Sequence, residues 1–97
     1  MADERALEDL VVGVLGGTGP QGRGLAVRLA AVGQRVLLGS RDAERAAEVA
    51  LEVGGRATAA AGGVEVWVQG GSNVDVAGAA DLVIVAAHLR GRRSRRA

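Results

Sequence analysis

The residues best suited to chemistry form a glycine-rich run near the start of this 97-residue chain. The run fits the pattern G-x-G-x-x-G and consists of Gly17, Thr18, Gly19, Pro20, Gln21 and Gly22. Where a strand turns into a helix, one such glycine permits the tight turn, one lets a pyrophosphate approach the backbone, and one lets the helix pack close to the strand. The helix that follows directs free N–H groups and a positive dipole end at the phosphates. The run therefore predicts a dinucleotide site; the alternative is a strand–helix corner that binds nothing.

A second group of polar residues comes about 20 residues later, where a dinucleotide fold binds the ribose. NAD enzymes place Asp or Glu at this point, whereas an arginine accommodates the 2′-phosphate of NADP. Here Ser40 and Arg41 occupy the position, no acid appears before Asp42, and Arg45 follows one helical turn later. A guanidinium suits phosphate oxygens, and arginines at a positive helix start are unfavourable unless an anion is near. These residues favour NADP over NAD; the alternative is that both arginines are merely solvated.

The elements that must position these residues follow from the apolar pattern. Strands are predicted over 11–15, 35–39, 64–69 and 82–87, and helices over about 21–32, about 42–53 and 74–80. Alternation of strands and helices predicts a parallel sheet with right-handed crossovers, hence an α/β Rossmann-type fold. The expected strand order is 3-2-1-4, with helices on both faces and the ligand crevice between the first and fourth strands.

Several local features are predicted within this arrangement. Gly33 should end the first helix, and Ser40 or Asp42 should cap the second. The second helix should place its apolar residues against the sheet, namely Ala46, Ala47, Val49, Ala50 and Val53. It should end at Gly54 and Gly55, with a loop over 57–63 and a turn over 70–73. The third strand is expected at an edge and the fourth to be fully buried.

Composition limits the class of protein. Hydrophobic residues make up 48% and charged residues 24%, which is ordinary for a soluble domain. There is no cysteine, no apolar signal region and no run near the roughly 20 residues that span a bilayer. We therefore expect a cytoplasmic protein without a membrane segment or metal site. We expect residues 1–10 to be a polar leader, 11–88 the nucleotide-binding domain, and 89–97 an arginine-rich tail without structure of its own.

Charge is distributed unevenly. All 12 basic residues are arginines and five lie in the last eight positions, so residues 1–89 carry seven arginines against 11 acids. The tail is either a solvated charged end, which we favour, or a patch for nucleic acid or another anionic surface. Nucleic-acid binding is not expected, because no aromatic residues accompany the arginines. His88 has no catalytic partner in the sequence pattern, and Trp67 is expected to pack in a strand.

The sequence motifs of both candidate sites resemble those of one family. Gly16–Ala26 reads G-G-T-G-P-Q-G-R-G-L-A and 39–45 reads G-S-R-D-A-E-R. Together they resemble the N-terminal half of NADPH-dependent reductases of the deazaflavin coenzyme F420, with similarity over about residues 11–87. The resemblance implies that Thr18, Gly19, Pro20 and Gln21 line the pyrophosphate of NADP. It also implies that Ser40, Arg41 and Arg45 hold the 2′-phosphate.

The family continues beyond the fourth strand, and this chain departs from it there. In that family a Thr-Pro-Trp or Val-Pro-Trp segment packs near the nicotinamide. The corresponding positions of this chain are Ala87, His88 and Leu89. We expect a truncated form, produced by a shift of reading frame, that lacks much of the F420 site and the homodimer contacts. The expected function is to bind NADP(H) for hydride transfer with reduced or oxidised F420, without a protein nucleophile. The alternatives are the NADP-binding half of a keto acid or imine reductase, or a nucleotide-binding remnant without activity.

Overall fold

The computed structural model describes residues 9–86, which form a four-stranded parallel sheet flanked by three helices. The elements in chain order are β1 (Val11–Leu15), α1 (Pro20–Ala31), β2 (Arg35–Ser40), α2 (Ala43–Ala60), β3 (Val68–Ser72), α3 (Asn73–Ala79) and β4 (Leu82–Val85). The sheet order is β3-β2-β1-β4 and each neighbouring pair is parallel. The predicted α/β Rossmann-type topology is confirmed.

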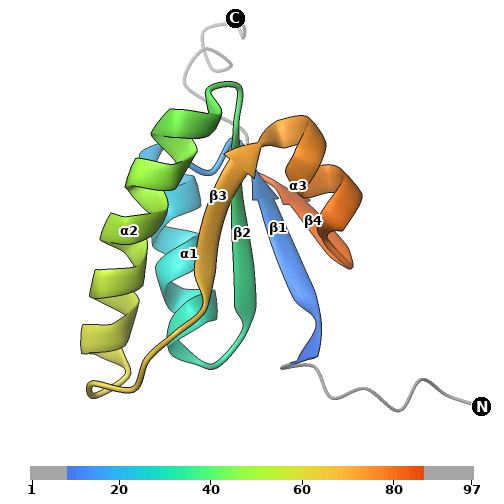
Figure 1. Cartoon of the computed structure of the whole chain (residues 1–97). Coiled ribbons are helices and arrows are strands. Elements are labelled where there is room, and N and C mark those ends of the chain that lie inside the picture. Colours follow the sequence, from blue (N-terminus) through green and yellow to red (C-terminus); the bar gives the residue numbers. More distant parts are fainter. Residues whose placement is uncertain (1–8, 87–97) are drawn as a thin grey trace, which may run out of the picture.

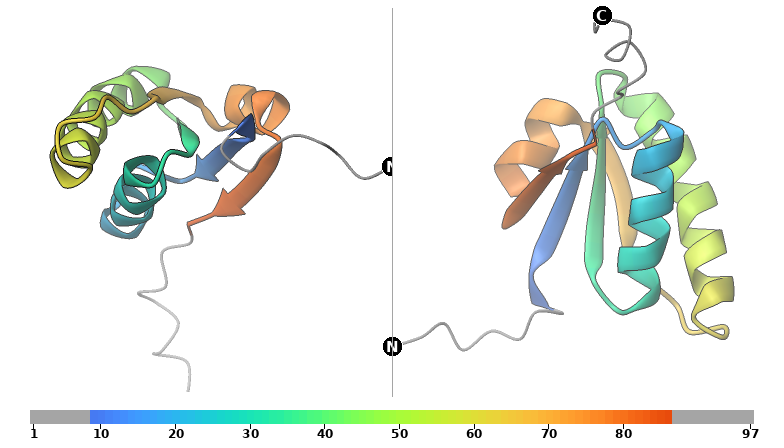
Figure 2. Two further views of the ribbon diagram at one scale, coloured as in Figure 1. Left: turned by 90° about the horizontal axis from the view of Figure 1, so that it is seen from below. Right: turned by 180° about the vertical axis from the view of Figure 1, so that it is seen from behind.

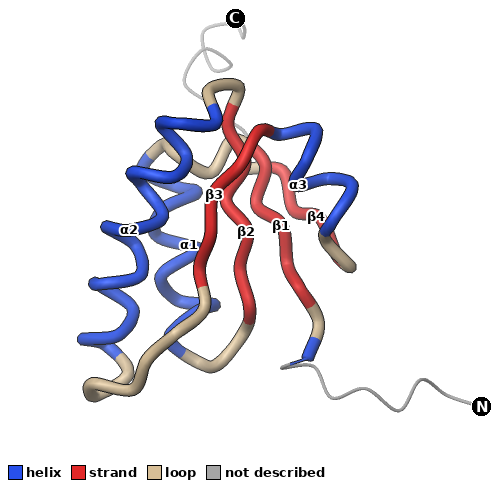
Figure 3. The backbone as a smooth tube through the Cα atoms, viewed as in Figure 1, coloured by secondary structure: helices blue, strands red, loops and turns tan. Residues whose placement is uncertain are grey.

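Helices cover the two faces of the sheet unequally. The first two helices lie together on one face and α3 lies on the other (Figures 1 and 2). This division follows from the right-handed crossovers, because the connection from β3 to β4 runs in the opposite direction across the sheet from the two before it. All four strands point the same way, so their carboxyl ends share one edge of the sheet (Figure 1). Figure 3 shows the strands side by side in red between the helices in blue. The glycine-rich turn and the end of β2 both lie at this edge.

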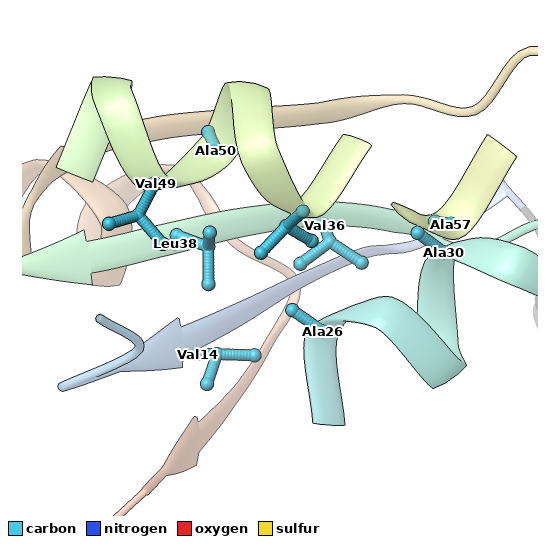
Figure 4. Close-up of a cluster of buried hydrophobic side chains, with 9 residues drawn as sticks. Val14, Ala26, Ala30, Val36, Leu38, Val49, Ala50 and Ala57 are labelled. Atoms are coloured by element: carbon cyan, nitrogen blue, oxygen red, sulfur yellow. The ribbon is translucent and has the colours of Figure 1, made fainter. Parts of the chain in front are cut away.

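The core lies between the sheet and the α1–α2 pair and is built from small aliphatic side chains (Figure 4). Its largest fully buried members are Leu38, Val14, Val36 and Val53. The helices contribute mostly alanine and valine, which lets their backbones approach the strands closely. No polar or charged side chain is buried among residues 9–86. The core therefore carries no chemistry, and candidate functional groups lie at its rim.

The buried residues of the two long helices are glycine, alanine and valine. In α1 the buried residues are Gly22, Ala26 and Ala30, whereas Leu25 and Leu29 are half-buried and Val32 is exposed. In α2 the expected inward residues are buried except Ala47, which is exposed. Small residues face inward because the helices lie so close to the sheet that larger side chains are displaced to the flanks.

The second helix is longer than predicted. It runs through Gly54 and Gly55 to Ala60, and the glycines with positive φ that follow it are Gly62 and Gly63. The prediction that the helix ends at 54–55, with loop from 57, was wrong. Burial of Val53 and Ala57 against the sheet outweighs the helix-weakening effect of the two glycines, about 1 kcal/mol each.

The third strand lies later in the chain than predicted. It spans Val68–Ser72 rather than 64–69, so Trp67 precedes the strand and is 39% exposed, and 70–72 is strand instead of turn. Gly70 explains the shift: a side chain there would collide with the backbone of Ala46 in α2. Only a strand with glycine at this position allows the helix to lie so close. Its predicted place at an edge of the sheet is confirmed.

The fourth strand is not fully buried, contrary to expectation. Leu82, Val83 and Val85 are 53%, 39% and 67% exposed. Within residues 9–86, β4 pairs only with β1, so its other edge and much of both faces remain uncovered. An all-apolar strand indicates burial from sequence alone, but burial also requires a neighbour. Residues 1–8 of the leader predicted over 1–10 lie outside the described residues, as do the positions from Ala87 onward, including His88 and the arginine-rich tail.

The glycines inside α2 generate a testable prediction. A Cβ added at Gly54 would have no neighbouring atom within 4 Å, and its φ is not positive. We expect Gly54→Ala to raise the free energy of unfolding by about 0.5–1 kcal/mol, because alanine loses less backbone entropy in a helix. Urea unfolding measures this, with Gly70→Ala as the matched variant expected to destabilise. A loss of stability in Gly54→Ala would show that the helix does not continue through this point.

Candidate functional site

The glycine-rich turn is fixed to the carboxyl edge of the sheet by two backbone N–H groups. Gly16 has a φ of +69° and donates to Asn73 Oδ1 at 3.2 Å, at the start of α3. Gly17 donates to the carbonyl oxygen of Gly39 at 2.9 Å, at the end of β2. The positive φ favours glycine at the point where the chain leaves β1. The second of these bonds places the turn directly beside the residue that precedes Ser40.

Two glycines allow α1 to begin against the turn. A Cβ on Gly22 would lie 2.5 Å from the Cα of Gly17, and one on Gly17 would lie 2.5 Å from a methyl group of Leu38. Both distances are far below a van der Waals contact, and at Gly22 the obstacle is backbone that cannot rotate away. These glycines are therefore needed for the close strand–helix approach that dinucleotide folds use.

Gly19 has a different environment. A Cβ added there would have no atom of the protein within 4 Å, and its φ of −82° suits any residue. The fold therefore does not require glycine at this position. The open space on the Gly19 backbone is what a bound phosphate group needs for close approach.

The N-terminus of α1 is prepared for an anion in a way that the other helices are not. Asp42 caps α2 by accepting from the N–H groups of Glu44 and Arg45, and Ser72 caps α3 by accepting from Asp75. Helix α1 has Gly19 at its N-cap, no side-chain cap and no acid in its first turn. Pro20, at the first position, has no N–H to satisfy. The first turn of α1, with Gln21 and Gly22, thus keeps the donor groups and the positive dipole end without a protein anion.

The end of β2 brings the second group of predicted residues to the same edge. Ser40 is the last residue of the strand, and its hydroxyl accepts from the N–H of Asp42 at 3.2 Å. Arg41 and Arg45 are exposed, and neither has an ion-pair partner among residues 9–86. The Asp42 carboxylate, the acid closest to this point in the sequence, is occupied as the α2 cap at 3.0 and 3.2 Å. The capping residue is therefore Asp42, one of the two candidates from sequence.

A shallow groove of about 630 Å³ runs from the turn along α1 to β4. Pro20, Gln21 and Leu25 form its helix side, and Ile84 and Val85 form its strand side. The groove lies between α1 and β4, beside the predicted crevice between the first and fourth strands, and no residue of β1 lines it. Its lining is mostly apolar, which suits a flat ring system, and its polar side chains are Gln21 near the turn and Arg28 in the last turn of α1.

The described part of the chain offers no other chemical centre. Residues 9–86 contain no cluster of three or more metal-ligating side chains. None of their helices combines the length and apolarity needed to cross a membrane. A second groove of about 440 Å³ lies at the opposite end of the sheet, between the ends of α1 and α2 and beside Trp67. It faces away from the turn and contains none of the predicted site residues.

Sequence reasoning missed three residues that touch the site or support it. Asn73 holds Gly16, while Arg23 donates to the carbonyl of Thr18 and pairs with Glu52 of α2. Arg23 lies inside the glycine-rich stretch and Asn73 inside the predicted turn over 70–73, but neither pattern assigns these residues a partner. Glu52 is 29 residues from Arg23, and only the packing of α1 on α2 brings the two together.

Comparisons with known proteins agree with this geometry. Residues 11–93 match the family model described as NADP oxidoreductase, coenzyme F420-dependent. The F420-dependent NADP reductases of Methanothermobacter thermautotrophicus and Methanothermobacter marburgensis are 43% and 42% identical over 82 residues, 81% of this chain in each case. That of Methanocaldococcus jannaschii is 39% identical over 74 residues, 76% of this chain. The chain spans about a third of the length of these relatives, 32%, 34% and 32% respectively.

The close approach at the turn can be tested with two glycines of the same helix. Gly22→Ala places a methyl group on the Gly17 backbone, so we expect the free energy of unfolding to fall by about 1–3 kcal/mol. Gly24→Ala is the control, because its Cβ would meet only the flexible end of Arg28 at 3.7 Å. Urea unfolding of both variants decides the matter. Equal stability of the two would mean that α1 does not begin against the turn as described.

Proposed function

The chain belongs to the coenzyme F420-dependent NADP oxidoreductase family, and from that premise we propose that it holds NADP(H) at the carboxyl edge of its sheet. In the full-length protein this part would serve hydride transfer between NADP(H) and the deazaflavin coenzyme F420. The relatives bear the name F420-dependent NADP reductase, which supports the proposal for both cofactors. The two cofactors would supply the hydride chemistry, and the protein would bind and orient them.

The observation that carries the proposal is the uncapped start of α1 beside the open backbone of Gly19. We assign the pyrophosphate to the turn and to the first turn of the helix, with Thr18, Gly19, Pro20 and Gln21 around it. Gly17 and Gly22 would contribute by allowing the approach of the helix. Helices α2 and α3 both have a side-chain cap and an acid in the first turn. The absence of both features at the start of α1 therefore supports an anion site there.

A preference for NADP over NAD is supported by the arrangement at the end of β2. Ser40, Arg41 and Arg45 offer a hydroxyl and two guanidinium groups that have no anionic partner among the described residues. An acid that bound ribose hydroxyls would favour NAD, but the Asp42 carboxylate already accepts two N–H groups of α2. We infer that the 2′-phosphate would take the position between these arginines, with charge-assisted hydrogen bonds.

The apolar groove between α1 and β4 is where the nicotinamide half would extend, because it begins at the turn. The chain spans about a third of the length of its relatives, and the proposal assigns no residue of 9–86 to an F420 site or a homodimer contact. Direct hydride transfer requires no protein nucleophile, and the proposal assigns no catalytic residue to residues 9–86.

Gly19 provides the most selective test of the pyrophosphate assignment. Gly19→Ala should leave the free energy of unfolding within about 0.5 kcal/mol, since the added methyl group meets no protein atom. It should weaken NADP binding by about 10-fold or more, because the methyl group occupies the space of the phosphate. Isothermal titration calorimetry with NADP measures the affinity. Unchanged affinity in the folded variant would refute the placement of the pyrophosphate.

The 2′-phosphate assignment predicts a difference between two cofactors. The unmodified chain should bind NADP at least about 10-fold more tightly than NAD, and Arg41→Ala should remove most of that preference without weakening NAD binding. Arg56→Ala is the control, because it removes an equally exposed charge from the far half of α2. Equal affinity of the unmodified chain for NAD and NADP would contradict the assignment of Ser40, Arg41 and Arg45.

A further inference from the structure

Arg23 reaches two partners on different elements. It lies near the start of α1, and its Nε donates to the carbonyl oxygen of Thr18 at 2.7 Å. Its Nη1 donates to Glu52 Oε1 of α2 at 2.9 Å, which is also an ion pair. The Arg23 side chain is 24% exposed and that of Glu52 is 48% exposed. A guanidinium has a rigid fork of donors, so engaging both ends fixes its orientation.

The ion pair with Glu52 compensates a positive charge that is unfavourable at the start of α1. A cation in the first turn of a helix is unfavourable because that end of the helix is already positive. Glu52 supplies the compensating charge from α2, while the first turn of α1 itself has no acid. The Arg23 charge is therefore directed to the loop carbonyl and to Glu52. It is not presented to the crevice as a free phosphate ligand.

The contact with Thr18 has a consequence for the next N–H group. No peptide bond among residues 9–86 is cis, and in a trans peptide the C=O and the following N–H point in opposite directions. Since the Thr18 carbonyl points at Arg23, the N–H of Gly19 points away from it. The N–H groups of Thr18 and Gly19 have no acceptor within the described part of the chain. They remain available to an anion.

Each residue of the turn is thus held by a different element. The Gly16 N–H is held by Asn73 and the Gly17 N–H by the Gly39 carbonyl, both at the sheet edge. The Thr18 peptide is held only by Arg23, and through it by Glu52. Without Arg23 nothing described in the chain fixes the rotation of this peptide unit.

We propose that Arg23, held by Glu52, is a positioning residue that fixes the Thr18–Gly19 peptide so that its N–H faces the pyrophosphate of NADP. The inference rests on the proposed function, because it concerns the same site. It adds a dependence of pyrophosphate binding on Glu52 of α2, an element that does not itself contribute to the glycine-rich turn. Arg23 would thereby influence affinity without touching the cofactor.

Two variants and two ligands test this proposal by calorimetry. Arg23→Gln removes the fork, and Glu52→Gln leaves Arg23 in place but removes the charge that holds it. Both should weaken NADP binding by about 10-fold. Both should change the binding of adenosine 2′-monophosphate less than about 2-fold, because that ligand has the 2′-phosphate but no pyrophosphate. Glu48→Gln is the control, since it removes another exposed acid from α2, and it should leave both affinities unchanged.

The outcomes distinguish a failure of the Arg23 proposal from a failure of the proposed function. An unmodified chain that binds NADP, with both variants binding it equally well, would overturn the role of Arg23. Equal weakening of NADP and adenosine 2′-monophosphate would also overturn it, because that result indicates general destabilisation. Retained binding of the monophosphate shows that a variant is folded, and Glu52→Gln decides the question if Arg23→Gln does not fold. Failure of the unmodified chain to bind NADP would instead refute the proposed function.

Discussion

The site depends on the contact between the backbones of Gly17 and Gly22, where α1 begins against the turn that follows β1. Because neither residue has a side chain, the helix axis starts close to the sheet and its first turn lies at the carboxyl edge. A side chain at Gly22 would push the helix away and separate its N–H groups from the end of β2, and one at Gly17 would collide with Leu38 and the Val14 backbone. The bond from Gly17 to the Gly39 carbonyl then joins the two halves of the site. The proposed phosphate site and the packing of the fold therefore depend on the same two glycines.

Close approach is repeated elsewhere in the molecule by the same means. Gly70 lets α2 lie on β3, and a side chain on Gly13 would collide with Val76 and Ala80 on the α3 side. The core between the sheet and the first two helices accordingly consists of alanine, valine and leucine without any aromatic ring. Small residues give little apolar area each, so stability comes from many short contacts and not from a few large side chains.

The sequence was most informative where one residue type has one physical use. Glycine at fixed spacing after an aliphatic run predicted the turn, and alternating elements predicted the sheet order, because crossover handedness leaves few topologies. It was least informative where packing decides. The sequence predicted that the second helix ends at Gly54, because a local pattern does not show how strongly the burial of Val53 and Ala57 stabilises the helix. The exposure of β4 and the meeting of Arg23 with Glu52 likewise depend on neighbours that are remote in sequence.

The central claim is that the turn and the end of β2 act together as one phosphate-binding surface. Amide proton–nitrogen NMR spectra recorded as NADP is added test it directly, because every N–H reports separately. The account predicts that the largest shifts fall on Thr18 and Gly19 and on Ser40 and Arg41, while amides of the groove beside Trp67 stay unchanged. Shifts concentrated at that opposite groove, or confined to β2 with none in the glycine-rich turn, would contradict it.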